Sequence, residues 1–120
     1  MSRGIEAQIP PVVRELGISV TAYGILSRGL LNRDTARLAE GDPRARFPRF
    51  QGGNLERNLE LLDALEKIAG ERVVSTAQLA FAWVAAQGDD IIPLIGTKRR
   101  DRLTEAMAAL DLRLTPDELA

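Results

Sequence analysis

The sequence contains no cysteine and no histidine. The absence of cysteine excludes a disulfide framework, a thiolate nucleophile and a thiolate-bound metal. The absence of histidine excludes the commonest general base, any serine–histidine pair and the usual zinc or iron ligand. Acid–base chemistry by these 120 residues alone would have to use a carboxylate, lysine, arginine or the single tyrosine, Tyr23.

Excess charge and long apolar runs are also missing. The 16 basic and 17 acidic residues leave a formal net charge of −1, which gives no field for holding a phosphate backbone, so we expect no nucleic-acid partner. No apolar run approaches the roughly 20 residues that a membrane span needs, and residues 1–4 do not begin the apolar region of a signal peptide. We therefore expect a cytoplasmic protein without membrane contact, either one ordinary domain or a piece of one.

The N-terminal part of the chain combines a helical pattern with a strand-like one. Apolar residues at helical spacing predict a helix within residues 5–16 that begins near Pro10 and Pro11, with one of these prolines in its first turn and a left-handed Gly17 at its end. Residues 18–26 are rich in β-branched residues and mostly apolar on both parities. That pattern is typical of a parallel strand that is covered on both faces.

The middle of the chain begins with a long segment that has no period. Residues 27–53 are rich in arginine, aspartate, glycine and proline, which indicates a functional loop or a disordered one. We predict that Asn54 then caps a helix that ends near Gly70. Ser75 and Gln78 have the spacing of a capping box, which predicts the start of the next helix.

The C-terminal part repeats the pattern of a strand followed by a helix. Residues 90–95 predict a second buried strand, and we interpret the Asp89-Asp90 pair before it as a turn rather than a metal site. The helix that Gly96-Thr97 is expected to open has an apolar stripe formed by Leu103, Met107 and Leu110. A second capping box, Thr115 with Glu118, predicts one more helix start.

Two short apolar strands do not form an independent parallel sheet, because each would expose an edge of unpaired backbone groups. The sequence therefore predicts part of a larger α/β array whose other strands are missing. The same edges predict self-association of the chain alone.

A basic segment follows the second predicted strand. Lys98, Arg99, Arg100 and Arg102 fall in what would be the first turn of a helix, where each cation opposes the helix dipole at a cost of about 0.3–1 kcal/mol. A bound phosphate would offset that cost, because free amides and cationic side chains would then converge on it. On a helix, Lys98 and Arg102 would also share one face. The alternative is a solvated basic turn, and this pattern alone does not decide between the two.

The same residues resemble the cofactor-binding end of the aldo/keto reductases, where a strand ending in Ile-Pro-Gly-Thr-Lys runs into a helix with an Arg-Leu-x-Glu-Asn pattern. Three other stretches agree in order and spacing, so that the resemblance covers essentially the whole chain. They are residues 14–18 with 21–31, residues 49–52 with 54–58, and residues 76–84.

The resemblance implies an α/β fold, a partial TIM (β/α)8 barrel in which residues 1–120 are the C-terminal portion, with the last two barrel strands, their helices and the loop 27–53. It implies an NADPH-dependent oxidoreductase that reduces aldehydes or ketones. The family's catalytic Asp, Tyr, Lys and His lie on earlier strands, so no catalytic residue is expected here and the chain alone should be inactive. The alternative function is a non-catalytic nucleotide-phosphate-binding module, or a remnant that completes another chain.

The resemblance also implies which residues contact NADP(H), while a carbonyl substrate would bind only in a full-length context. The positions along the diphosphate are Tyr23, Gly24, Ile25, Leu26, Ser27 and Arg28. The positions at the 2′-phosphate and the adenine amine are Gly96, Thr97, Lys98, Arg102 and Glu105. Tyr23 has an alternative interpretation as a half-buried packing residue, and Gly24, Ile25 and Ala106 depart from the usual family residues.

Overall fold

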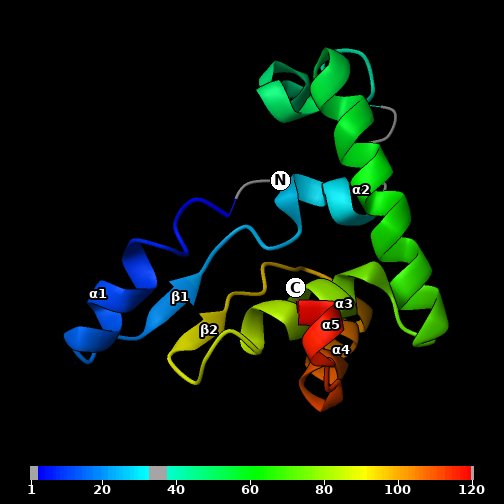
Figure 1. The fold of residues 1–120 in the computed structure, drawn as a ribbon. Coiled ribbons are helices and arrows are strands. Elements are labelled where there is room, and N and C mark those ends of the chain that lie inside the picture. The colour runs from blue at the N-terminus through cyan, green and yellow to red at the C-terminus, as the bar shows by residue number, and fades with distance from the viewer. Residues whose placement is uncertain (1–2, 33–37, 120) are drawn as a thin grey trace.

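The computed structural model describes residues 3–32 and 38–119, and its framework is a parallel sheet of two strands (Figure 1). Strand β1 spans Val20–Ala22 and strand β2 spans Ile91–Pro93. Parallel strands need a crossover connection, and the described part of this one contains two α-helices and three short 3₁₀ segments. The register places Val20 opposite Ile91, Thr21 opposite Ile92 and Ala22 opposite Pro93.

Both strands are shorter than the sequence predicts. Residues 18–26 and 90–95 were expected as strands covered on both faces, yet Ile18 and Ile92 are exposed. One further hydrogen bond extends the ladder at each end, from the Val20 N–H to the Asp90 carbonyl at 2.7 Å and from the Leu94 N–H to the Ala22 carbonyl at 3.0 Å. The prediction of length and full burial is wrong because a strand extends only as far as it has a partner.

Helix α1 (Ile9–Glu15) precedes the first strand and follows the local rules of its sequence. The helix begins next to its prolines and Gly17 adopts the left-handed conformation with φ +66°, as predicted, although both Pro10 and Pro11, not one of them, lie in the first turn. Its apolar side chains are nevertheless exposed, including Ile9 and Val12. The helix therefore presents an apolar face that the described residues do not cover.

The loop that follows β1 is partly ordered. Its described residues, up to 32 and from 38 onward, contain three short 3₁₀ segments, η1 (Ser27–Asn32), η2 (Pro43–Arg46) and η3 (Pro48–Phe50), so the prediction of an irregular segment is only partly right. Leu30 and Phe50 are buried and anchor this region to the rest of the chain. The part of the predicted loop at residues 33–37 lies outside the described residues.

Helices α2 (Gly52–Glu71) and α3 (Thr76–Ala85) form the crossover. The predicted Asn54 cap is wrong, because α2 begins after an extended Gln51 and Asn54 already lies in its first turn. The predicted capping box of α3 is confirmed: the Gln78 N–H donates to Ser75 Oγ at 3.1 Å, and the Ser75 N–H donates to Gln78 Oε1 at 2.9 Å.

The C-terminal helices are α4 (Arg100–Ala108), η4 (Ala109–Asp111) and α5 (Pro116–Leu119). The predicted start of α4 at Gly96-Thr97 is wrong, because the Arg99 N–H donates to Thr97 Oγ1 at 3.1 Å and holds the chain outside the helix. The second capping box is confirmed by hydrogen bonds of 2.7 and 3.3 Å between Thr115 and Glu118.

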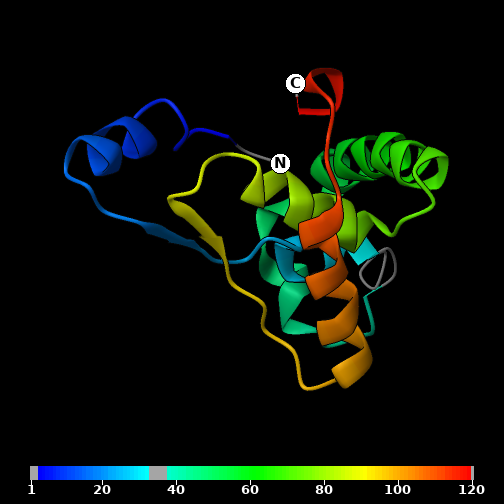
Figure 2. The same cartoon turned by 90° about the horizontal axis from the view of Figure 1, so that it is seen from below.

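Helix α3 lies at the centre of the molecule, between β2 and α4 (Figure 2). Its Phe81 and Ala82 pack against Ala106 and Ala109, and these four residues form the core cluster. The predicted stripe of α4 instead faces solvent, with exposed fractions of 46% for Leu103, 51% for Met107 and 52% for Leu110. Across residues 3–32 and 38–119, no helix is both long and apolar enough to span a membrane.

We expect the 120-residue chain, expressed by itself, to self-associate. Among the described residues, β1 and β2 pair only with each other, so each has an unpaired outer edge, and α1 and α4 also expose apolar side chains. Size-exclusion chromatography with light scattering should give species larger than 13.1 kDa. A sharp monomer peak, together with strongly protected amides in both strands, would contradict this expectation.

Candidate functional site

Two loops leave the same edge of the sheet. Tyr23 and the residues after it follow β1, and residues 94–98 follow β2. Because the strands are parallel, both carboxyl ends lie at one edge, which is where ligands bind in α/β sheets and barrels. Ile25 and Ile95 both pack against the core cluster below. The structure therefore brings the two predicted cofactor segments, far apart in sequence, to a common edge.

The first loop has an unusual backbone. Ser27 and Arg28 adopt positive φ angles of 50° and 61°, followed by Gly29 at 91°. Hydrogen bonds from the Ser27 N–H to the Gly24 carbonyl and from the Gly29 N–H to the Leu26 carbonyl, both 2.9 Å, close these turns. Left-handed conformations cost free energy in residues other than glycine and persist where neighbouring contacts impose them. They concentrate at functional sites, which makes this loop a candidate.

Tyr23 lies just beyond the end of β1. Its exposed fraction is 84%, so the interpretation of a half-buried packing residue is wrong. The strand ends at Ala22, and Gly24 then turns the chain with φ +77°. Tyr23 thus stands at the edge of the sheet where the two loops emerge.

The second loop, which follows β2, exposes its charged and polar residues to solvent. Gly96, Thr97 and Lys98 are exposed, and the space beside Gly96 is empty. Lys98 precedes α4, so the prediction that Lys98 and Arg102 share a helix face is wrong. Only Arg100 and Arg102 lie in the first turn, so the unfavourable interaction with the helix dipole is smaller than the sequence predicts.

Arg102 and Glu105 form an ion pair on α4, with Arg102 Nη1 at 2.9 Å from Glu105 Oε2. A hydrogen bond from Ser75 and the bond from Arg102 both lower the pKa of the Glu105 carboxyl, so it is ionised at neutral pH. Sequence reasoning assigned Ser75 only a capping role. Its contact with Glu105 depends on how α3 packs on α4, and no local pattern reports that packing.

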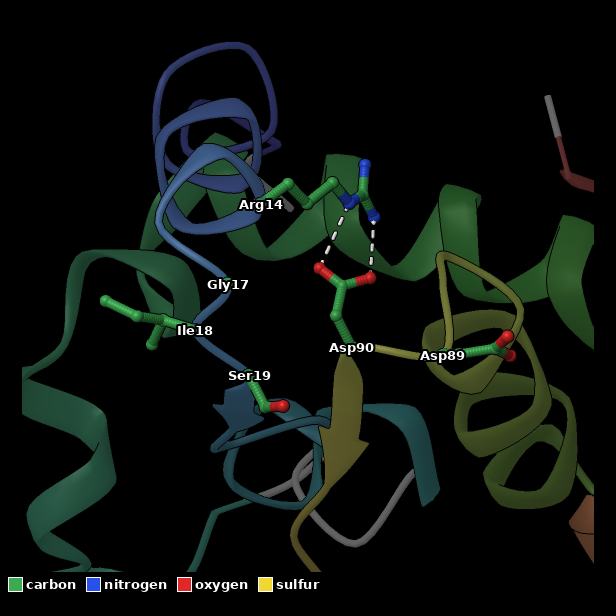
Figure 3. A pocket seen from close by; sticks show the side chains of 6 residues that line it. All are labelled: Arg14, Gly17, Ile18, Ser19, Asp89 and Asp90. Atoms are coloured by element: carbon green, nitrogen blue, oxygen red, sulfur yellow. Dashed lines mark hydrogen bonds and ion pairs between the residues drawn. The ribbon is translucent and has the colours of Figure 1, made fainter.

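The opposite edge of the sheet holds a different hollow (Figure 3). It has a volume of about 440 Å³ and lies where α1 meets the turn before β2. Arg14 forms two hydrogen bonds to Asp90, Nε to Oδ2 at 3.0 Å and Nη2 to Oδ1 at 3.2 Å, and Nη2 also donates to the Gln87 carbonyl at 2.8 Å. The Asp89 carboxylate points away from Arg14 in Figure 3. The residues lining the hollow are Arg14, Gly17, Ile18, Ser19, Asp89 and Asp90.

This hollow is a structural junction rather than a candidate site. The hydrogen bonds from Arg14 lower the pKa of the Asp90 carboxyl and tie α1 to the start of β2. The prediction of a turn at Asp89-Asp90 is confirmed. Within the described ranges, no cluster of three or more cysteine, histidine, aspartate or glutamate residues could hold a metal. The amino ends of parallel strands commonly carry stability, while their carboxyl ends carry function.

We predict that Asp90→Asn speeds amide exchange in α1 and at Val20 at neutral pH. The lowered pKa of Asp90 means that its ionised form stabilises the fold, and that this contribution disappears as the pH falls through the folded-state pKa. The variant and the unmodified chain should therefore differ at neutral pH and converge in acid. Hydrogen exchange read by mass spectrometry measures this, with Asp89→Asn as the matched control.

A second substitution tests the same junction without changing charge. A Cβ on Gly88 would lie 2.4 Å from Asp90 Oδ1 and 2.6 Å from Arg14 Nη2, so Gly88→Ala should displace the ion pair. It should speed exchange at the same amides. Unchanged exchange in both Gly88→Ala and Asp90→Asn would show that the ion pair does not hold α1.

Comparison with known proteins agrees with this fold. The profile of the Aldo/keto reductase family matches residues 2–120. The "Aldo-keto reductase yakc [NADP(+)]" of Schizosaccharomyces pombe is 40% identical over 113 residues, which are 92% of this chain and 33% of that protein. The structure of the glycerol dehydrogenase AKR11B4 from Gluconobacter oxydans superposes with a TM-score of 0.87 at 33% identity, over 98% of this chain and 36% of that one. The chain spans about a third of each relative, and it belongs to the aldo/keto reductase family.

Proposed function

We propose that this chain forms part of the NADPH-binding site of an oxidoreductase that reduces aldehydes or ketones. The observation that carries the proposal is the exit of both candidate loops at one edge of a parallel sheet. The chain would contribute the last two strands of a (β/α)8 barrel and the helices around them. NADP(+) in the name of the fission-yeast relative supports this choice of cofactor.

Lys98 and Arg102 are the proposed partners of the cofactor's 2′-phosphate. Lys98 is exposed, while Arg102 is half-buried and paired with Glu105. A partly exposed ion pair contributes about 0–1 kcal/mol, whereas a charge-assisted hydrogen bond to phosphate contributes about 1.5–3 kcal/mol. A phosphate therefore competes successfully for Arg102, and Lys98 adds to the attraction.

Glu105 and the first loop complete the proposed contacts. The ionised Glu105 carboxylate can accept a hydrogen bond from the exocyclic amine of adenine while Ser75 holds it in place. Gly24 and Ile25 leave mainly backbone groups for the diphosphate, and the left-handed Ser27 and Arg28 fix the direction of those groups. When bound, the cofactor supplies the hydride, and the acid–base groups come from outside this chain.

The first expected result concerns selectivity for NADP⁺ over NAD⁺. The chain should bind NADP⁺ more tightly, and the difference should shrink as salt screens the cationic contacts. Lys98→Ala combined with Arg102→Ala should remove most of the preference, while Lys67→Ala on α2 should leave it intact. Isothermal titration calorimetry measures all three. Equal affinities for the two cofactors in the unmodified chain would show that Lys98 and Arg102 do not bind the 2′-phosphate.

The second expected result is that the 120-residue chain alone does not reduce a panel of aldehydes and ketones with NADPH. General acid catalysis supplies about 10²–10⁴-fold, and its groups are expected outside this chain. NADPH absorbance measures turnover. Activity that survives purification and is lost in Tyr23→Phe would contradict the proposal, because it would make Tyr23 a proton donor. NADP⁺ binding without turnover also fits the alternative of a non-catalytic nucleotide-phosphate-binding module.

A further inference from the structure

Arg28 is held by a segment that follows it in sequence. Its guanidinium lies over the ring of Phe47, 4.4 Å from the ring centroid. Its backbone carbonyl accepts a hydrogen bond from Arg44 Nη1 at 3.2 Å. These two contacts act on different parts of Arg28, the side chain and the left-handed backbone, so together they restrict both.

Arg44 is itself fixed by Asp42. The carboxylate accepts from Arg44 Nε at 3.0 Å, from Nη2 at 2.7 Å and from the Arg44 backbone N–H at 2.8 Å. This carboxylate also caps η2, in which Arg44 lies. Arg44 therefore reaches the Arg28 carbonyl from a side chain that is already ordered.

Helix α2 and Gln51, the residue just before it, hold the remainder of the segment through three side-chain amides. Gln51 Nε2 donates to the Ala45 carbonyl at 2.9 Å, and Asn54 Nδ2 donates to the Pro48 carbonyl at 3.3 Å. Asn58, with an exposed fraction of 7%, is the buried polar residue of the set. Its Nδ2 donates to the Arg49 carbonyl at 3.1 Å.

We infer that residues 42–50 form a latch that holds Arg28 against the diphosphate of the cofactor, with Arg44 and Phe47 as its positioning residues. The inference rests on the proposed function, because it assigns to Arg28 the diphosphate of the same cofactor. The left-handed backbone of Ser27 and Arg28 costs free energy, and the contacts with the latch keep the backbone in that conformation. The loop therefore already has the shape that binds an anion, which lowers the free-energy cost of ordering it on binding. Lys98 and Arg102 serve the other phosphate, so the two groups of residues make separable contributions.

The test compares two ligands in the 120-residue chain. NADP⁺ carries both the diphosphate and the 2′-phosphate, whereas adenosine 2′-monophosphate carries only the latter. Phe47→Leu removes the ring beneath Arg28 and should weaken NADP⁺ binding about two- to five-fold, the range for an exposed cation–π contact, with adenosine 2′-monophosphate unaffected. Arg44→Gln should act in the same direction. Phe47→Trp, which retains an aromatic face, should restore affinity, and Arg46→Gln in the same 3₁₀ turn is the charge-matched control.

The set of results separates failure of the latch from failure of the proposed function. If the unmodified chain binds neither ligand, both the latch and the proposed function fail. If it binds NADP⁺ and both Phe47→Leu and Arg44→Gln bind it equally well, the latch is wrong and the cofactor assignment stands. Equal weakening of both ligands in these variants would also overturn the latch, since the segment would then only support the fold.

Discussion

The parallel pairing of β1 with β2 is the constraint on which the rest of the structure depends. It brings Val20 next to Ile91 across two intervening helices, and it sets the carboxyl ends of both strands at one edge. Three residue pairs supply few hydrogen bonds, so apolar burial must hold the sheet in place. Phe81 and Ala82 on α3 do this, because the core cluster that they form also receives Ile25 from the first loop. Full burial of a phenylalanine side chain contributes about 1.5–3 kcal/mol, whereas a partly exposed ion pair such as Arg14–Asp90 at the opposite edge contributes about 0–1 kcal/mol.

Local sequence rules predicted the features that depend on neighbouring residues alone. The capping boxes at Ser75 and Thr115 and the left-handed Gly17 required no tertiary information, because each is settled within four residues. Two helix starts were wrong for one common reason, which is that a side chain bonded to a different backbone group. Asn54 donates to the Pro48 carbonyl instead of capping, and Thr97 Oγ1 accepts from the Arg99 N–H and delays α4. A pattern of residue types does not show which hydrogen bond forms, because the same polar side chain can either cap the predicted helix start or bond to another backbone group.

Burial was harder to predict than element type. The periodicity of α4 correctly indicated a helix, but its stripe of Leu103, Met107 and Leu110 is exposed, and small alanines make the contact with α3. Ile9 on α1 and Ile92 on β2 are exposed in the same way. Periodicity records which faces a sequence can bury, and burial itself needs a partner. The glycerol dehydrogenase structure, about three times as long, superposes on nearly the whole chain. We propose that the apolar faces left exposed here are those that the rest of such a barrel would cover.

The sequence could suggest the residues of the candidate site but not how they are held. Family resemblance suggested Arg28 and Glu105, whereas the residues that fix them belong to the crossover and its approach. Ser75, at the start of α3, bonds Glu105, and the amide of Asn58 on α2 anchors the segment whose Phe47 lies beneath Arg28. The two parts of the candidate site, the loop with Arg28 and the part of α4 with Glu105, are therefore positioned by residues near the amino-terminal ends of the two crossover helices. The start of α3 also contacts the first loop, because Thr76 Oγ1 donates to the Leu31 carbonyl in η1 at 2.6 Å, and α3 packs against α2. A substitution that shifts α3 would therefore move both parts of the candidate site together.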